Sequence, residues 1–218
     1  MSKLVIFGTG SFAQLAHFYF ANDSEHEVVA FTVNEDHMSE LEFNGLPVEV
    51  FEEIEHRYPP GAFKMFVAVG YKGLNRVRAG IYSEAKETGY ELVSYVSSQC
   101  TYWGKGIGDN CFIFEDNTIQ PFVSIGNNVV IWSGNHIGHH STIGNHCFIS
   151  SHVVVSGNCR IGDYCFIGVN ATIRDSVSIG NSCLVGAGSL IMKSTMDNEL
   201  YIEKGTTPDK RSADQIEI

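Results

Sequence analysis

The sequence is poor in basic residues. It has 14 lysines and arginines against 25 aspartates and glutamates, which gives a formal net charge of -11 at pH 7. This charge argues against a general surface for polyanions such as nucleic acids, although a local basic pocket could still bind a phosphate. The sequence also lacks a long apolar segment that could span a membrane. Its first residues run directly into an expected strand, so we predict no signal peptide and a cytoplasmic protein.

A six-residue repeat occupies the second half of the chain. Such a period is neither helical nor the alternation of a strand, and it is typical of a parallel β-helix. Three hexapeptides form one triangular coil, so residues 18 apart stack on one face at about 4.8 Å, and we predict five coils within residues 99–218. We expect the glycine that often follows each inward aliphatic residue to adopt the positive φ of a corner. The fifteen inward residues, spaced six apart without interruption, are Ile107, Ile113, Ile119, Ile125, Ile131, Ile137, Ile143, Ile149, Val155, Ile161, Ile167, Ile173, Ile179, Val185 and Ile191.

The six cysteines raise the question of disulfides or a metal site. Cys111, Cys147, Cys165 and Cys183 share one phase of the repeat, four residues after an inward aliphatic residue. This inward position has little space and suits a small apolar side chain. We therefore predict buried free thiols in a reducing cytosol, and no metal site.

Residues 1–98 lack the six-residue register and are predicted to form a separate domain. The expected strands cover residues 3–7, 27–33, 48–50, 64–69 and 91–96, and the expected helices cover 11–22, 51–57 and 74–88. This alternation is typical of a small Rossmann-like α/β domain with a parallel sheet.

The first expected strand ends in the turn Gly8-Thr9-Gly10-Ser11-Phe12-Ala13, which suits a phosphate above a helix N-terminus. Glu35 and Asp36, near the end of the second strand, would fit a nicotinamide cofactor. The domain spans roughly half of a dinucleotide fold, so we favour a mononucleotide-type ligand such as the diphosphate of a nucleotide sugar. A tight turn without a ligand is the remaining alternative. The expected contacts are Gly8, Gly10 and Ser11 in this turn, and Gly70, Tyr71, Lys72, Asn75 and Arg76 after a later strand.

A small α/β domain followed directly by hexapeptide repeats, from Lys3 to about Lys210, resembles the sugar O- and N-acyltransferases. That family includes the sialic acid O-acetyltransferases and the N-acetyltransferases of nucleotide-linked amino sugars. The resemblance implies a left-handed β-helix, a nucleotide sugar held by the first domain, and acetyl-CoA in the cleft between neighbouring subunits of a homotrimer. The acidic pair that often ends the second strand in this family is replaced here by Val33-Asn34, and Asn34 is the expected substrate contact at that place.

The family's catalytic base lies in a stretch that resembles Ile137-Gly138-His139-His140-Ser141-Thr142-Ile143-Gly144. The resemblance therefore implies that His139 is the general base. In many members an acidic residue follows the histidine, and here His140 takes its place, so the sequence does not identify the group that orients His139. The acetyl-CoA contacts implied by the resemblance are Phe148, Gly157, Val169 and Ala187.

Five histidines between His136 and His152 raise the alternative of a zinc site with carbonic-anhydrase-like chemistry. His140, His146 and His152 are six residues apart, so each lies on a different side of the prism. They cannot converge within one subunit, which argues against a metal.

Acetyl transfer from acetyl-CoA to the amine of a nucleotide-linked amino-dideoxyhexose is the function that these features favour. Sugar O-acetylation of the sialic acid type and a non-enzymatic nucleotide-binding trimeric scaffold are the alternatives. A nicotinamide oxidoreductase is disfavoured because the second half offers no groups for hydride transfer. The outward aromatic residues predict burial of the β-helix against neighbouring subunits; they include Phe112, Phe122, Trp132, Phe148 and Phe166.

Overall fold

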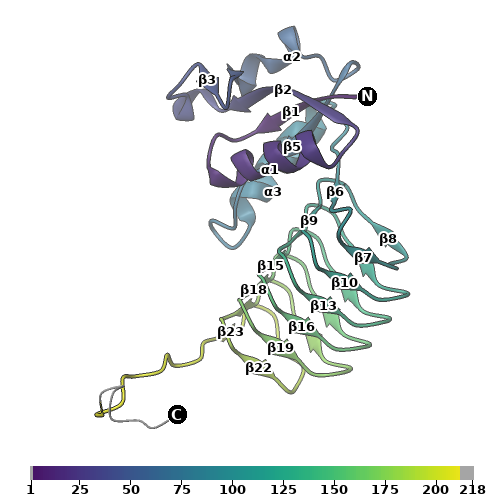
Figure 1. Cartoon of the computed structure of the whole chain (residues 1–218), viewed down its shortest axis with the longest axis vertical. Helices are drawn as coiled ribbons and strands as arrows, with labels where there is room; N and C mark the ends of the chain where they lie inside the picture. The colour runs from purple at the N-terminus through teal and green to yellow at the C-terminus, as the bar shows by residue number, and fades with distance from the viewer. Residues whose placement is uncertain (1, 212–218) are drawn as a thin grey trace.

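The chain folds into a small α/β domain that sits on the first coils of a three-sided β-helix (Figure 1). The computed structural model describes residues 2–211. Within this range, none of the helices combines the length and the apolar composition that a membrane crossing requires.

The α/β domain is built on a five-stranded sheet. Its strands are β1 (Ser2–Phe7), β2 (His26–Val33), β3 (Glu42–Phe43), β4 (Leu46–Val50) and β5 (Phe63–Val67), in the order β3-β4-β2-β1-β5. All neighbours are parallel except β3 and β4. The helices are α1 (Ser11–Asn22), α2 (Ile54–Arg57) and α3 (Arg76–Glu87), with the 3-10 helices η1 (Glu35–His37) and η2 (Phe51–Glu53). Helix α1 packs on one side of the sheet and α2 and α3 on the other, so the predicted α/β architecture is confirmed.

The strand expected at residues 91–96 divides between the two parts of the molecule. Leu92 forms a single bridge with Met65 at the edge of the α/β sheet, whereas β6 (Tyr95–Val96) pairs with strand Phe112–Ile113 of the β-helix. The Tyr95 and Phe112 rings pack against each other in a tilted arrangement with centroids 4.6 Å apart, which favours this pairing. The β-helix therefore begins shortly before the boundary predicted between residues 98 and 99.

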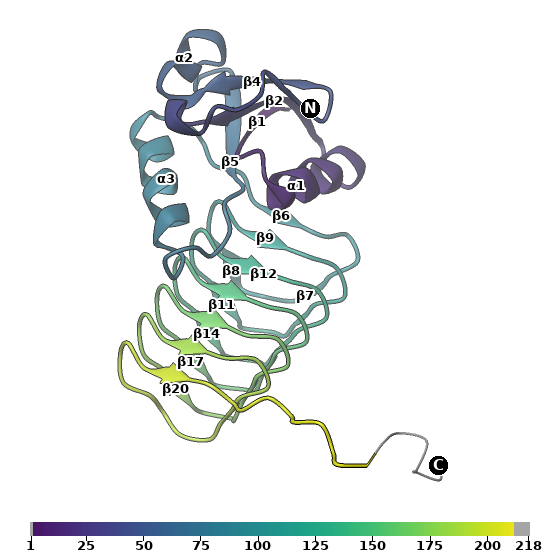
Figure 2. The same cartoon turned by 90° about the vertical axis from the view of Figure 1, so that its left-hand side faces the viewer.

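The β-helix has three faces, each a stack of two-residue parallel strands (Figure 2). Face 1 consists of β6, β9 (Phe112–Ile113), β12 (Val130–Ile131), β15 (Phe148–Ile149), β18 (Phe166–Ile167), β21 (Leu184–Val185) and β23 (Leu200–Tyr201). Face 2 consists of β7 (Thr101–Tyr102), β10 (Thr118–Ile119), β13 (His136–Ile137), β16 (Val154–Val155), β19 (Thr172–Ile173) and β22 (Leu190–Ile191). Face 3 consists of β8 (Gly106–Ile107), β11 (Ser124–Ile125), β14 (Thr142–Ile143), β17 (Arg160–Ile161) and β20 (Ser178–Ile179). Partners in the central coils are 18 residues apart, such as Val130 and Phe148, so the prediction of three hexapeptides per coil is confirmed.

The aliphatic residues of the repeat fill the interior of the prism. Those from Ile113 to Ile191 are at most 5% exposed, and Ile107 at the first coil is half-buried. All six cysteines are free thiols, and five of them are buried among these residues, as predicted for the inward position. Burial raises the pKa of the Cys111 thiol to about 12, which keeps it protonated.

The glycine after each inward aliphatic residue has a different role from the one predicted. Gly138 does not have a positive φ; the positive φ occurs two residues later, at positions such as His140 and His146 (both 58°). The glycine is required because neighbouring coils approach closely. A Cβ on Gly138 would lie 2.5 Å from the carbonyl carbon of Ser156 on the next coil. The expectation of a positive φ at this position is therefore wrong.

The α/β domain covers face 1 of the β-helix. Phe112 packs edge-on against Phe12 and Phe20 of α1, with ring centroids 5.6 and 5.8 Å apart, and Phe148 packs against Tyr71 at 4.9 Å. Phe112 and Phe148 are consequently buried within the chain. Most of the apolar surface that was expected to meet neighbouring subunits is thus covered by the chain's own first domain.

A buried arginine joins α3 to the coils. The guanidinium of Arg78 donates to the backbone carbonyls of Gly70, Asn128, His146 and Cys147 at 3.0–3.3 Å, and to the side-chain oxygens of Asn75 and Asn128 at 3.1 Å. Arg78 is 0% exposed, and no carboxylate in residues 2–211 forms an ion pair with it. Burial lowers the pKa of Arg78 to about 10, so the side chain is still charged at neutral pH.

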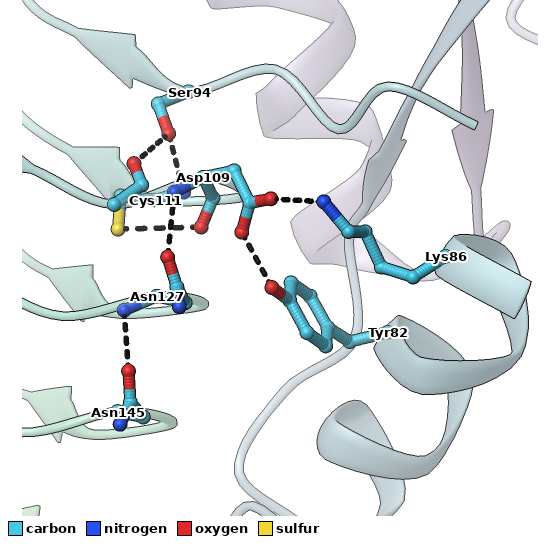
Figure 3. Close-up of polar contacts among 8 residues, drawn as sticks. Tyr82, Lys86, Ser94, Asp109, Cys111, Asn127 and Asn145 are labelled. Atoms are coloured by element: carbon cyan, nitrogen blue, oxygen red, sulfur yellow. Dashed lines mark hydrogen bonds and ion pairs between the residues drawn. The ribbon is translucent and has the colours of Figure 1, made fainter. Parts of the chain in front are cut away.

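A second contact fixes α3 to the top of the β-helix (Figure 3). Tyr82 Oη donates to Asp109 Oδ1 at 2.6 Å, and Lys86 Nζ lies 2.6 Å from Asp109 Oδ2. Burial and the Asp109 carboxylate raise the pKa of Tyr82, so its hydroxyl remains a donor. Below Asp109, side-chain oxygens cap backbone amides of the coil above: Asn127 Oδ1 accepts from the Asp109 amide, and Asn145 Oδ1 accepts from the Asn127 amide. This ladder gives α3 a rigid surface to bind.

Candidate functional site

A cavity of about 410 Å³ lies at the carboxyl ends of β1, β2 and β5, the edge at which parallel α/β sheets bind ligands. Its lining comes from three chain segments: Phe7, Gly8, Thr9 and Gly10; Val33, Asn34 and His37; and Ala68, Val69, Gly70, Lys72, Val77 and Ile81. Five of the predicted substrate contacts are therefore brought together here: Gly8, Gly10, Asn34, Gly70 and Lys72.

The turn between β1 and α1 requires glycine at residue 8, where the backbone passes close to Ala68. Gly8 has a φ of 117°, and a Cβ on it would lie 2.9 Å from the carbonyl oxygen of Ala68. Any other residue at this position would be strained. Helix α1 begins at Ser11 and has no acidic residue in its first turn, so its N-terminal amides present the positive end of the helix dipole. These are the features that bind a phosphate group.

The charge around the cavity also suits an anion. Lys72 and His37 are the ionisable side chains that line it, and no carboxylate does. A neighbouring cavity of about 460 Å³ also reaches Asn34, but four glutamates line it. Those carboxylates would repel a diphosphate. The cavity at Gly8 is therefore the better site for a nucleotide diphosphate.

The end of β2 is arranged differently from a nicotinamide site. Asn34 Nδ2 donates to Glu52 Oε1 at 3.0 Å, and the Glu35 amide donates to the other oxygen of the same carboxylate at 3.1 Å. Neither Glu35 nor Asp36 lines the cavity, whereas His37 does. No motif in the sequence pointed to His37, because its position depends on the short helix η1.

The other predicted substrate contacts lie outside the cavity lining. Ser11 is the first residue of α1, and Tyr71 packs on Phe148 of face 1. Arg76 is the first residue of α3, where its guanidinium lies over the Tyr164 ring and donates to the Ser182 hydroxyl. Asn75 is fully buried at the start of α3, where its Oδ1 accepts a hydrogen bond from Arg78. Its Nδ2 donates to a backbone carbonyl of the β-helix. Because both ends of this side chain are engaged between the domains, we leave Asn75 out of the proposed site.

His139 lies on the corner between faces 2 and 3, two residues after β13, and its side chain is exposed. Its amide donates to Gln120 Oε1 at 2.9 Å. Its Nδ1 lies 3.1 Å from His140 Nδ1, so one of the two rings carries the shared hydrogen. The His140 ring in turn packs on Phe122 at 4.6 Å between centroids. His140 is therefore able to fix the orientation of His139, while His139 Nε2 forms no hydrogen bond within residues 2–211.

Gly157 lies directly below His139 on the next coil. A Cβ at residue 157 would be 2.8 Å from both Cε1 and Nε2 of His139, and 3.1 Å from Oδ1 of Asp175, one coil further down. The absence of a side chain at Gly157 thus leaves the space in which the His139 ring lies. The sequence gave no reason to single out Asp175, because its relation to His139 depends on a stacking distance of 36 residues across a glycine.

The predicted acetyl-CoA contacts are spread over three places. Gly157 lies beside His139, whereas Val169 and Ala187 stack on the corner between faces 1 and 2, where both are exposed. Phe148 is buried at the domain interface. These residues do not form one site within a single chain, although Gly157 lies at one edge of face 2 and Val169 and Ala187 lie at the other.

The other histidines have structural roles in the turns. His140, His146 and His152 all occupy the corner position with a φ of 58–59°. His146 Nδ1 lies 2.9 Å from Asn128 Nδ2, and burial lowers the pKa of His146. In the part of the chain that the structure describes, no three His, Cys, Asp or Glu side chains come together as a metal site.

The cavity and His139 lie on opposite sides of the β-helix within one chain. The α/β domain covers face 1, and His139 lies on the corner between faces 2 and 3, which is the corner opposite face 1 in a three-sided prism. The packed aliphatic interior separates them. The interior of the prism therefore lies between the cavity side of the chain and its own His139.

The repeat region of the chain matches a known family model. Residues 104–139, 124–157 and 158–193 match the family model of the bacterial transferase hexapeptide (six repeats). No curated protein matches the chain in sequence.

Several solved structures share the fold over nearly the whole chain. The acetyltransferase domain of PglB from Neisseria gonorrhoeae FA1090 is 24% identical, with a TM-score of 0.79 over 92% of this chain and 96% of that one. It has also been solved in complex with acetyl coenzyme A. PerB from Caulobacter crescentus, solved in complex with CoA and GDP-perosamine, is 22% identical, with a TM-score of 0.79 over 92% and 93%. WeeI from Acinetobacter baumannii AYE is 20% identical, with a TM-score of 0.60 over 92% and 96%.

These matches confirm the predicted resemblance at the level of the repeat and the fold. The chain consists of a small α/β domain followed by a left-handed parallel β-helix that is built from bacterial transferase hexapeptide repeats.

Proposed function

We propose that the protein transfers the acetyl group of acetyl-CoA to the amine of a nucleotide-linked amino-dideoxyhexose, and that it works as a homotrimer. The ligands named for similar structures support this proposal: PerB was solved with CoA and GDP-perosamine, and the PglB domain with acetyl coenzyme A. Fold alone does not decide chemistry, so the argument rests on the two halves of the site.

The observation that carries the proposal is the separation of the anion-binding cavity from His139 within one chain. A head-to-tail contact repeated around a threefold axis would bring the His139 corner of one copy to the cavity of the next, and such a ring closes on itself. Face 2, which borders this corner, carries the exposed apolar side chains Val154 and Leu190, at 40% and 59% exposure. Contact with a neighbouring copy would cover them.

The cavity would bind the nucleotide part of the substrate. The first-turn amides of α1 and the Lys72 ammonium would hold the diphosphate. The sugar would then extend out of the cavity toward the neighbouring copy. Acetyl-CoA would enter along the cleft between copies, bordered by Gly157 on one side and by Val169 and Ala187 on the other.

His139 would act as the general base. If its Nδ1–H donates to His140 Nδ1, its Nε2 keeps a free lone pair on the exposed corner. The amine attacks the thioester carbon, a C–N bond forms and the C–S bond breaks, and the amine proton passes to Nε2. The imidazolium then gives this proton to the departing thiolate. The buried cysteines are not needed in this sequence, because the acetyl group passes directly between the two substrates.

Release of free CoA in the presence of acetyl-CoA tests the proposal. The wild-type protein should release CoA with nucleotide-linked amino sugars and not with the matched hydroxy sugars; the reverse preference would favour O-acetylation. Binding of nucleotide sugars without CoA release would favour the scaffold. His139→Asn should lower kcat by roughly 10²-fold or more while leaving the KM for the nucleotide sugar nearly unchanged, because the base does not hold the nucleotide.

Mixed oligomers test whether two copies share one site. Lys72→Glu should impair the cavity, and His139→Asn should impair the base. When the two inactive variants are co-expressed and purified through two different tags, mixed trimers should regain activity, because an intact cavity then meets an intact base. Inactivity of isolated mixed trimers would contradict a site shared between copies.

We also place the protein in the cytoplasm. All six cysteines are free, and five are buried, which suits a reducing compartment.

A further inference from the structure

The corner that carries His139 differs from the corner that carries the asparagine ladder. On the ladder corner, the residue two after each inward aliphatic residue is Asn or Asp, and from Asn127 to Asn181 its Oδ1 caps the amide of the coil above. Asp163 Oδ1 accepts from the Asn145 amide at 2.7 Å, and Asn181 Oδ1 accepts from the Asp163 amide at 2.9 Å. The Oδ1 atoms of Asp163 and Asn181 are thus used by the fold as caps.

Asp175 occupies the same position of the repeat on the His139 corner, but it is not used in that way. Its Oδ2 accepts a hydrogen bond from Ser176 at 2.8 Å, and its Oδ1 has no hydrogen-bond partner within residues 2–211. The side chain is exposed, so nothing in the packing of the chain requires a carboxylate here.

The free oxygen of Asp175 and the free nitrogen of His139 approach the same point. That point is the position of the missing Cβ of Gly157, 2.8 Å from His139 Nε2 and 3.1 Å from Asp175 Oδ1. A side chain at residue 157 would occupy this space and separate the two groups. Asp175, two coils below, thus presents a carboxylate to the edge of His139 that faces away from His140.

We propose that Asp175 is the carboxylate partner of His139, which reaches it across Gly157 from two coils below. This inference rests on the proposed function, in which His139 Nε2 takes the proton of the amine as the C–N bond forms. The imidazolium formed at that moment carries a positive charge on the edge that faces Asp175 Oδ1, and a nearby carboxylate stabilises it. The charge disappears again when the proton passes to the thiolate that leaves as the C–S bond breaks. Asp175 is a positioning residue in this scheme, because it acts through His139.

The arrangement also accounts for the departure at His140. Where an acidic residue follows the histidine, one neighbour in the sequence can both orient the ring and balance its charge. Here the two tasks are divided: His140 contacts Nδ1, and Asp175 faces Nε2. A carboxylate at residue 175 is therefore expected to matter in this chain even though it lies 36 residues from the base.

Asp175→Asn is the informative variant, because it keeps the shape and removes the charge. Asp116→Asn is its matched control: Asp116 is an exposed aspartate on the corner between faces 1 and 2, and its φ of 58° is one that asparagine accepts. Relative to the wild-type protein, Asp175→Asn should lower kcat about tenfold and leave the KM for both substrates within about twofold of the wild-type values. This is the result expected when a group acts only in the transition state. Asp175→Glu should restore part of the loss, and Asp116→Asn should behave as wild type.

A spectroscopic measurement makes the test independent of turnover. The side-chain 15N signals of His139 can be identified by their absence in His139→Asn. The Nε2 signal should move in Asp175→Asn and stay in place in Asp116→Asn. If Asp175→Asn matches Asp116→Asn in either the kinetics or the Nε2 signal, the pairing is refuted. If the wild-type protein acetylates no amine, the proposed function fails instead, and an unmoved Nε2 signal in Asp175→Asn would still refute the pairing on its own.

Discussion

The fully buried guanidinium of Arg78 permits a demanding test of how the two domains are held together. Arg78→Met keeps the length and apolar stem of the side chain and removes all of its donors. Six hydrogen bonds are lost, and their acceptors belong to the Gly70–Asn75 loop on one side and to the coils at residues 128, 146 and 147 on the other. These acceptors lie in a packed interface, with Phe148 6.0 Å from the guanidinium carbon, so water has little access to replace the arginine.

The expected loss of stability follows from two opposing terms. Each buried acceptor left without a donor costs about 1–3 kcal/mol, although a carbonyl that keeps another partner costs less. Removing a buried cation that has no carboxylate partner offsets part of this loss of stability, because desolvation of the charge is itself unfavourable. We expect a net loss of about 3 kcal/mol, at the lower end of values for broken buried charge networks. For a chain of this size, that corresponds to a fall in Tm of roughly 6–12 °C.

Thermal unfolding at fixed protein concentration measures this effect, with Arg76→Met as the matched control. Arg76 lies on the same helix and is exposed, and its guanidinium lies over the Tyr164 ring and donates to the Ser182 hydroxyl. Arg76→Met should therefore lower the free energy of unfolding by less than about 1 kcal/mol. Arg78→Met should also raise the KM for the nucleotide sugar, because Gly70 lines the cavity and accepts from Arg78. If the two variants unfold at the same temperature, the interpretation of Arg78 as the link between the domains is refuted.

Two further substitutions test local features. Gly8→Ala should lower the free energy of unfolding by about 1–3 kcal/mol and weaken nucleotide-sugar binding measured by calorimetry, because a Cβ cannot be accommodated at this φ beside Ala68. Gly10→Ala is the control, because a Cβ there meets nothing within 4 Å, and equal stability of the two variants would contradict this account. Cys165→Ala should lower stability by about 1–2 kcal/mol through the cavity that it leaves, with kcat retained in the folded protein; loss of turnover at unchanged stability would show a chemical role for the thiol.

The sequence predicted those features that repeat or that depend on neighbouring residues. The uninterrupted series from Ile107 to Ile191 predicted the prism, its interior and the buried cysteines, because one side chain per hexapeptide has to point inward. The glycine turn after β1 predicted the cavity edge in the same way. The positive φ was assigned to the wrong position, since the constraint on Gly138 comes from a neighbouring coil and not from the turn itself.

Features that depend on packing between distant segments were not predictable. The outward aromatic residues of face 1 gave the correct expectation of burial, but nothing in their spacing distinguished another subunit from the chain's own α1. Asn75 shows the same ambiguity, because a polar residue at a helix start fits a ligand site and a domain interface equally well. To predict the relation of Asp175 to His139, one would have to know which corner the two residues occupy, the register of two coils and the effect of having no side chain at Gly157.

The 18-residue repeat turns the β-helix into a ruler. Helix α3 and the loop before it contact the coils from Asn128 to Ser182. One coil inserted within this stretch would move the later contacts along the axis by one strand spacing, about 4.8 Å, so the two domains would no longer match in register. A coil added after Ser182 would leave these contacts intact, so the β-helix is expected to tolerate changes in length only at its C-terminal end.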